Sequence, residues 1–202
     1  MQTVDCAITL LNHRDTEPTR RLTLSKAANA APNKAPISFT FEQEPVSQES
    51  AISALLVCTK AWATEAAVRS VAHRLSKNTQ VVLLGNGMGL AERVIPLIGD
   101  AALILGSTTA GCRRNDRNRL HLSSAGTTYL GPAGADSNPP SWLPLWQRSL
   151  TQCHWQPDIR SILLAKTAVN AVINPLTAIH QVKNGALLKP QLLSSTEAAI
   201  TE

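Results

Sequence analysis

The chain has 202 residues and a formal net charge of +5; hydrophobic residues make up 44% of it and aromatic residues only 3%. This composition argues against a disordered chain and predicts a core of aliphatic side chains, which is typical of parallel strands covered by helices. The positive charge favours anionic partners, such as a phosphorylated cofactor or a carboxylate substrate. Nucleic acid is not an expected partner, because the basic residues neither form a helical stripe nor alternate with aromatic residues.

The cysteines and histidines do not indicate a metal site. Four cysteines and five histidines are scattered along the chain, without a C-x-x-C pair. The dense basic run at 113–119 contains Asp116 and is predicted to be a solvated turn between two strands. We identify no run of about 18 apolar residues and no secretory signal at the start. The chain is therefore predicted to be cytoplasmic and not to span a membrane.

In the first half of the chain, short apolar runs alternate with segments whose apolar residues recur at helical spacing. In chain order, the predicted elements are a strand at 6–12, a loop to about 36 with a short strand at 38–41 after it, a strand at 54–59, a helix over 62–75 and a strand at 80–84. Strands that alternate with helices indicate βαβ units and a parallel sheet.

The second half begins with the same alternation of strands and helices, and short consecutive strands then follow. The predicted elements are a helix over 90–98, a strand at 101–105, short strands at 107–112, 119–124 and 127–130, a loop at 134–140, a helix over 142–151 and a long helix over 159–181. The three short strands are predicted to form an antiparallel extension of the sheet. The fold class is therefore α/β: an incomplete Rossmann-like nucleotide-binding domain over 1–156, followed by the beginning of an all-helical domain over 157–202.

Within the long predicted helix, the polar residues Lys166, Asn170 and Asn174 recur four apart. Each step of four advances about 40° around a helix, so the three side chains form one narrow polar line on an otherwise apolar surface. A cleft-facing strip and plain structural hydrogen bonding or exposure are about equally consistent with this pattern. In a cleft, an ammonium group would protonate a carbonyl oxygen as an alkoxide develops, and Asn amides would orient a hydroxyl or carboxylate.

Three further motifs follow predicted strands. The turn Gly85-Asn86-Gly87-Met88-Gly89 stands where open α/β sheets bind ligands, although it gives G-x-G-x-G and not the dinucleotide fingerprint. A ligand site and a plain turn are about equally consistent with it. Lys60 follows the strand at 54–59, where it would reach a phosphate or ribose, or lie on the surface. Arg14 follows the first predicted strand, at a position typical of an arginine that binds the 2′-phosphate of NADP, although Asp15 stands beside it and an ordinary exposed arginine fits the position almost equally well.

Five segments, in this order, resemble the ketopantoate reductase (2-dehydropantoate 2-reductase) family. The segments are LLVCTKAW, VVLLGNGMG, LGSTTAGCRR, TTYLGP and AKTAVNAVINPLTAIHQVKNGAL. The last is the most specific, and together the matches span roughly residues 5–190. The resemblance implies an oxidoreductase of pantothenate biosynthesis that reduces ketopantoate to pantoate with NADPH, and a homodimer in the complete protein.

The resemblance also implies roles for individual residues. Lys166 would be the catalytic acid that protonates the carbonyl reduced at C2 of ketopantoate. The substrate-binding site would be lined by the amides of three residues, Asn170, Asn174 and Asn184. The cofactor would be contacted by Asn86, near the nicotinamide, and by Lys60 and Arg14.

The chain departs from the family pattern at both ends, so we expect it to be truncated there. It has no strand with a G-x-G-x-x-G turn before residue 6, and it lacks the later helices that supply a Glu and a Ser to the substrate site. In the family's sheet the absent strand would lie between residues 6–12 and 54–59. Two alternatives stay open: a related NADP-dependent 2-oxo acid reductase, and a pseudoenzyme or binding module that lacks catalysis.

Overall fold

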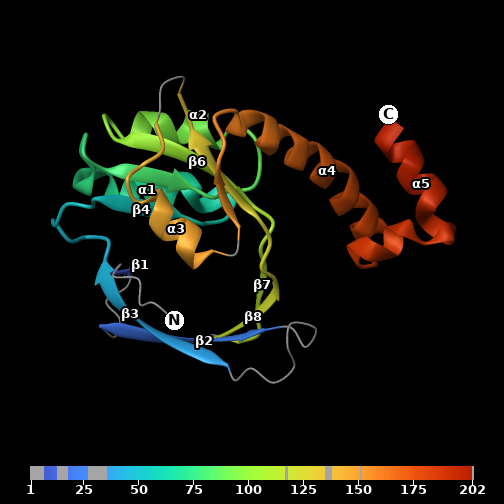
Figure 1. Ribbon diagram of the computed structural model, residues 1–202, viewed down its shortest axis with the longest axis horizontal. Helices are drawn as coiled ribbons and strands as arrows, with labels where there is room; N and C mark the ends of the chain where they lie inside the picture. Colours follow the sequence, from blue (N-terminus) through green and yellow to red (C-terminus); the bar gives the residue numbers. More distant parts are fainter. Residues whose placement is uncertain are drawn as a thin grey trace.

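The computed structural model describes residues 7–12, 18–26, 36–116, 118–134, 138–150 and 152–201. Within these ranges the chain forms two five-stranded sheets and a pair of C-terminal helices. In Figure 1 one sheet lies with its helices in the upper part of the molecule, the other sheet lies below it, and the C-terminal helices project to one side.

The first sheet, here called the upper sheet, is the one that the aliphatic runs predict. Its strands are ordered β10 (Cys153–Trp155), β9 (Thr128–Pro132), β6 (Ala102–Thr108), β5 (Gln80–Leu83) and β4 (Ala54–Val57). The pairs β4–β5 and β5–β6 are parallel, whereas β9 runs antiparallel to β6. The α/β class and the parallel order of these three strands are therefore confirmed.

Helices cover both faces of the upper sheet. On one face, α1 (Thr64–Val71) and α2 (Leu90–Val94) bury Val68 and Val94 against the strands, and both side chains are fully buried. On the other face, α3 (Leu143–Ser149) packs against Val82 and Leu130. The predicted helices over 62–75 and 90–98 are present, but their ends are 3-10 turns: η1 (Ala61–Ala63), η2 (Ala72–Arg74) and η3 (Ile95–Leu97).

The second sheet, here called the lower sheet, differs from the prediction. Its order is β1 (Thr9–Asn12), β3 (Ile37–Pro45), β2 (Thr19–Lys26), β8 (Arg119–Ser124) and β7 (Gly111–Arg114). The predicted loop up to residue 36 therefore contains a strand, β2, and the short strand at 38–41 is longer than expected. The antiparallel extension is correct only for β9; β7 and β8 do pair with each other, but in the lower sheet.

The register explains why a segment as polar as β2 is a strand. Leu22 and Leu24 lie opposite Phe39 and Ile37 of β3, so the apolar side chains of both strands gather on one face. The intervening polar residues fall on the other face, as the two-residue period of a strand requires.

One buried ion pair links the two sheets. Arg74, at the end of η2, is only 4% exposed. Its Nη2 donates to Glu44 Oε1 of β3 at 2.6 Å and to Ser50 Oγ at 2.9 Å, and its Nε donates to Ser50 O at 2.7 Å. The guanidinium therefore ties the end of β3 to the helical layer of the upper sheet.

The strands β1 and β4 each stand at the end of their sheet. Each has one parallel neighbour, β3 and β5 respectively. Leu56 of β4 is 49% exposed at this edge.

The long predicted helix is α4 (Ile159–His180), followed by η4 (Asn184–Leu188) and α5 (Pro190–Thr201). With 22 residues and a mean hydropathy of 1.5, α4 is long and apolar enough to cross a membrane by length and composition alone. The chain is expected to contain no uninterrupted run of about 18 apolar residues, and α4 is not such a run, because Lys166, Asn170 and Asn174 interrupt it. These few polar residues barely lower its average hydropathy. In the structure α4 contacts β6, β9, η4 and α5.

Candidate functional site

The candidate site lies at the edge of the upper sheet where three parallel strands end. Val57 of β4, Leu83 of β5 and Leu105 of β6 are aligned in the sheet register. Their carboxyl ends therefore meet at one edge, which is where open α/β sheets bind ligands. Lys60 and Asn86, both exposed, follow the first two of these strands, and β6 extends further to Thr108.

The glycine turn after β5 presents an open backbone. Gly87 and Gly89 have φ values of +106° and +77°, which side-chain-bearing residues rarely adopt. A Cβ at either position would have no atom within 4 Å, so both glycines border open space. Gly85 is different, since a Cβ there would lie 2.5 Å from Leu90 Cδ1. Gly85 thus packs closely against the Leu90 side chain, whereas the other two leave room beside the turn.

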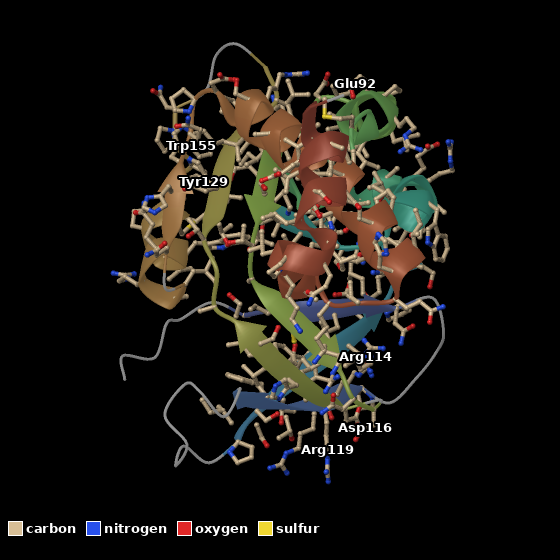
Figure 2. All side chains as sticks on the ribbon, turned by 90° about the vertical axis from the view of Figure 1, so that its right-hand side faces the viewer. Glu92, Arg114, Asp116, Arg119, Tyr129 and Trp155 are labelled. Atoms are coloured by element: carbon tan, nitrogen blue, oxygen red, sulfur yellow. The ribbon has the colours of Figure 1, made fainter. Side chains whose placement is uncertain are left out.

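A cavity of about 250 Å³ lies beside this turn. Its walls come from three places: the glycine turn with the start of α2, the last residue of β5 with the middle of β6, and the first turns of α4. Arg160 borders it and bonds to two other segments, with Nη1 3.5 Å from Glu92 Oε1 and Nη2 donating to Ala133 O at 3.1 Å. Figure 2 shows Glu92 at the upper end of the molecule, beside the helices.

Lys166 of α4 reaches the end of β6. Its Nζ donates a hydrogen bond to Thr108 O at 2.7 Å, and the side chain is half-buried. Desolvation by burial lowers the pKa of this ammonium below that of an exposed lysine. A lysine so placed gives up its proton more readily than a solvated one, which suits a proton donor to a carbonyl oxygen.

The asparagines of the predicted polar line lie on the same unbroken helix. Asn170 is half-buried and Asn174 is exposed, one and two helical turns beyond Lys166. Asn184 is exposed at the start of η4. The structure thus places Lys166 at the strand ends, with the amides progressively further along the helical part.

The loop that carries Lys60 is held by residues that the sequence did not single out. Thr64 is fully buried, and its Oγ1 donates to Lys60 O at 3.2 Å. The same hydroxyl is 3.1 Å from Thr59 Oγ1. A threonine at the start of a helix is common, so its role in fixing Lys60 becomes visible only in the structure.

Two other sequence predictions have different outcomes. The basic run at 113–119 joins the antiparallel strands β7 and β8, its described residues are exposed, and Arg119 Nε lies 3.6 Å from Asp116 Oδ2. The prediction of a solvated turn is therefore confirmed for the described residues, and Figure 2 shows this turn at the opposite end of the molecule from Glu92. Arg14 lies outside the described residues.

Together these features define a two-part protein in which a Rossmann-like α/β domain is followed by helices, with a lysine of the first long helix at the sheet's ligand-binding edge. Residues 2–135 match the family model described as ketopantoate reductase PanE/ApbA, and residues 158–202 match that of its C-terminal domain. The chain belongs to the ketopantoate reductase family.

Sequence similarity to individual 2-dehydropantoate 2-reductases supports this family assignment. The chain is 33% identical over 149 residues to the 2-dehydropantoate 2-reductase of Vibrio cholerae, covering 73% of this chain and 50% of that protein. It is 40% identical over 134 residues to the enzyme of Shigella flexneri, covering 66% and 43%. The chain thus spans about half the length of the curated relatives that it matches.

Solved structures share the fold. A probable 2-dehydropantoate 2-reductase from Bacillus subtilis superposes with a TM-score of 0.72 at 24% identity, over 96% of this chain and 66% of that one. D-mandelate dehydrogenase, in a ternary structure with NADH and anilino(oxo)acetate, gives a TM-score of 0.72 at 18% identity, over 87% and 56%. At these identities the likeness concerns the fold alone.

Proposed function

We propose that this chain carries out, as part of the whole protein, the NADPH-dependent reduction of 2-dehydropantoate (ketopantoate) to pantoate in pantothenate biosynthesis. The observation that carries the proposal is the half-buried Lys166, whose Nζ lies 2.7 Å from Thr108 O at the carboxyl edge of the parallel strands. Family membership supports the substrate, because the curated relatives are 2-dehydropantoate 2-reductases.

The chemistry of the proposal rests on Lys166. Reduction of the C2 carbonyl leaves negative charge on its oxygen, and an ammonium nearby both stabilises that charge and supplies the proton. Because desolvation lowers the pKa of Lys166, the proton moves to the oxygen more easily than from a solvated lysine. The neutral amine would then take up a proton from solvent before the next turnover.

The residues around the glycine turn fit a nicotinamide cofactor. Gly87 and Gly89 leave open space against the backbone, and the adjoining cavity of about 250 Å³ admits part of a ligand. NADPH, when bound, would supply the hydride. We assign Asn86 to its nicotinamide end and Lys60 to its phosphate or ribose, and we keep Arg14 as the residue expected to bind the 2′-phosphate.

The substrate would lie between that turn and α4. Asn170, Asn174 and Asn184 carry amides that accept and donate hydrogen bonds without charge, so they orient a hydroxyl or a carboxylate without repelling it. We further propose that the protein is cytoplasmic and that the whole protein forms a homodimer. The ketopantoate reductase of Staphylococcus aureus, whose structure shares this fold, is dimeric.

The test is a substrate comparison in the whole protein. Purified protein is incubated with NADPH and either ketopantoate or another 2-oxo acid, and cofactor oxidation and product identity are measured. We expect the highest kcat/KM with ketopantoate and pantoate as the product. A higher kcat/KM with another 2-oxo acid would support the related-reductase alternative, and no turnover of any 2-oxo acid would support a binding module.

A further inference from the structure

Lys166 is held by a backbone carbonyl that takes no part in the β6–β9 hydrogen bonds. In the β6–β9 pair, Thr109 N donates to Thr127 O at 2.9 Å and Ala133 N donates to Leu103 O at 3.1 Å. Odd-numbered residues of β6 therefore bond to β9, and the backbone groups of Thr108 point to the other side. On that side β5 ends at Leu83, level with Leu105, so β6 extends beyond its neighbour. The carbonyl of Thr108 is thus available to the Lys166 ammonium.

The position of Thr108 is in turn fixed by a pair of hydroxyl groups. Thr108 lies directly opposite Thr128 in the register, and their Oγ1 atoms are 2.9 Å apart. In a pair of this type the side chains approach most closely, so the two hydroxyls meet without backbone distortion. Thr128 is only 6% exposed, and Thr108 Oγ1 also accepts a hydrogen bond from Ala110 N at 3.2 Å.

A glycine just before β9 packs against the same segment. Gly126 has a φ of +59°, and a Cβ there would lie 2.2 Å from Ala110 N and 2.3 Å from Thr109 C. The backbone at 109–110 therefore packs directly on Gly126. Residues 108–110 are thus held by Thr128 and by Gly126, although none of these residues is charged.

We infer that Thr128 is a positioning residue for Lys166, acting through its hydroxyl bond to Thr108. The bond fixes the end of β6, the Thr108 carbonyl holds one ammonium hydrogen, and the ammonium is thereby kept at the strand ends and out of solvent. The consequence for turnover rests on the proposed function, whereas the effect on Lys166 itself does not.

The test compares three substitutions in the whole protein. Thr128→Val removes the hydroxyl and keeps the branched shape, and Thr128→Ser keeps the hydroxyl. Thr127→Val is the matched control, because the Thr127 hydroxyl donates to Gln152 Oε1 at 2.6 Å and not to Thr108. The pKa of Lys166 is measured by NMR with 13C-labelled lysine, with Lys166→Arg to assign the resonance.

We expect Thr128→Val to raise the pKa of Lys166 towards that of an exposed lysine, because the ammonium regains water. Thr128→Ser and Thr127→Val should leave it unchanged. The same pKa in Thr128→Val as in the wild type would overturn the inference. If Thr128→Val does not fold, Thr108→Val removes the same hydroxyl bond from the other strand and is judged by the same criterion.

Kinetics separate this inference from the proposed function. If the protein reduces ketopantoate, Thr128→Val should lower kcat by about tenfold or more, since small misplacements of a catalytic group are costly, and KM should change little. A shifted Lys166 pKa in a protein without reductase activity would uphold the positioning role and reject the function. An unshifted Lys166 pKa in an enzyme that reduces ketopantoate would reject the positioning role and uphold the function.

Discussion

Replacing Glu44 by Gln should destabilise the protein through the buried guanidinium of Arg74. Glu44 Oε1 accepts hydrogen bonds from Arg74 Nη2 at 2.6 Å and from Ser50 Oγ at 2.9 Å. The arginine side chain is 3% exposed and that of Glu44 is 22% exposed. No described residue accepts a hydrogen bond from Arg74 Nη1, so the carboxylate is the main compensation for the buried charge.

The magnitude follows from these contacts. Leaving a fully buried charge without its partner costs about 3–5 kcal/mol, and a hydrogen bond to a charged group contributes about 1.5–3 kcal/mol. Glutamine keeps an accepting oxygen and the site is partly open to water, so the lower range applies. We expect Glu44→Gln to lower the free energy of unfolding by about 2 kcal/mol.

Urea titration followed by tryptophan fluorescence measures this free energy. Glu42→Gln is the matched control, because it lies on the same strand with an exposed side chain; its effect should stay within about 0.5 kcal/mol. Equal midpoints for the two variants, with an unchanged slope, would show that the Arg74–Glu44 pair does not hold the two sheets together.

Three further predictions concern the site. Because burial lowers the pKa of Lys166 and a proton donor must be protonated, kcat should fall as pH rises through a value below that of an ordinary lysine; a rate still rising at the pKa of an exposed lysine would contradict this. Asn174→Ala should act partly through KM, since its amide orients substrate, and a change confined to kcat would argue against that role. The whole protein should bind NADPH more tightly than NADH through Arg14, and Arg14→Ala should abolish the difference; equal dissociation constants for the two cofactors in the wild type would exclude it.

Continuous aliphatic runs made much of the fold predictable. The strands at 54–57 and 80–83 and the helix from Ile159 to His180 lie almost where the pattern places them. The strand β2 is not evident from the sequence, because polar residues and prolines dominate the stretch up to residue 36. Only pairing with Phe39 and Ile37 of β3 shows which face is apolar.

The part of the candidate site that could be predicted consists of residues that lie near one another in the sequence. Lys166, Asn170 and Asn174 share one helix, so their spacing alone aligns them. Thr108 and Thr128 are twenty residues apart and meet only through the antiparallel register of β6 and β9. A hydrogen-bond partner that is set by strand register and by the length of a neighbouring strand cannot be recognised from the residue types alone.

The most direct measurement is the kcat of Lys166→Ala for ketopantoate with saturating NADPH, in the whole protein. Lys77→Ala, which removes an exposed lysine before β5, is the matched control. We expect Lys166→Ala to lower kcat by about two or more orders of magnitude, the usual scale for loss of a general acid, with the Kd for NADPH retained and the control unaffected. An unchanged kcat in Lys166→Ala would contradict the assignment of Lys166 as the proton donor.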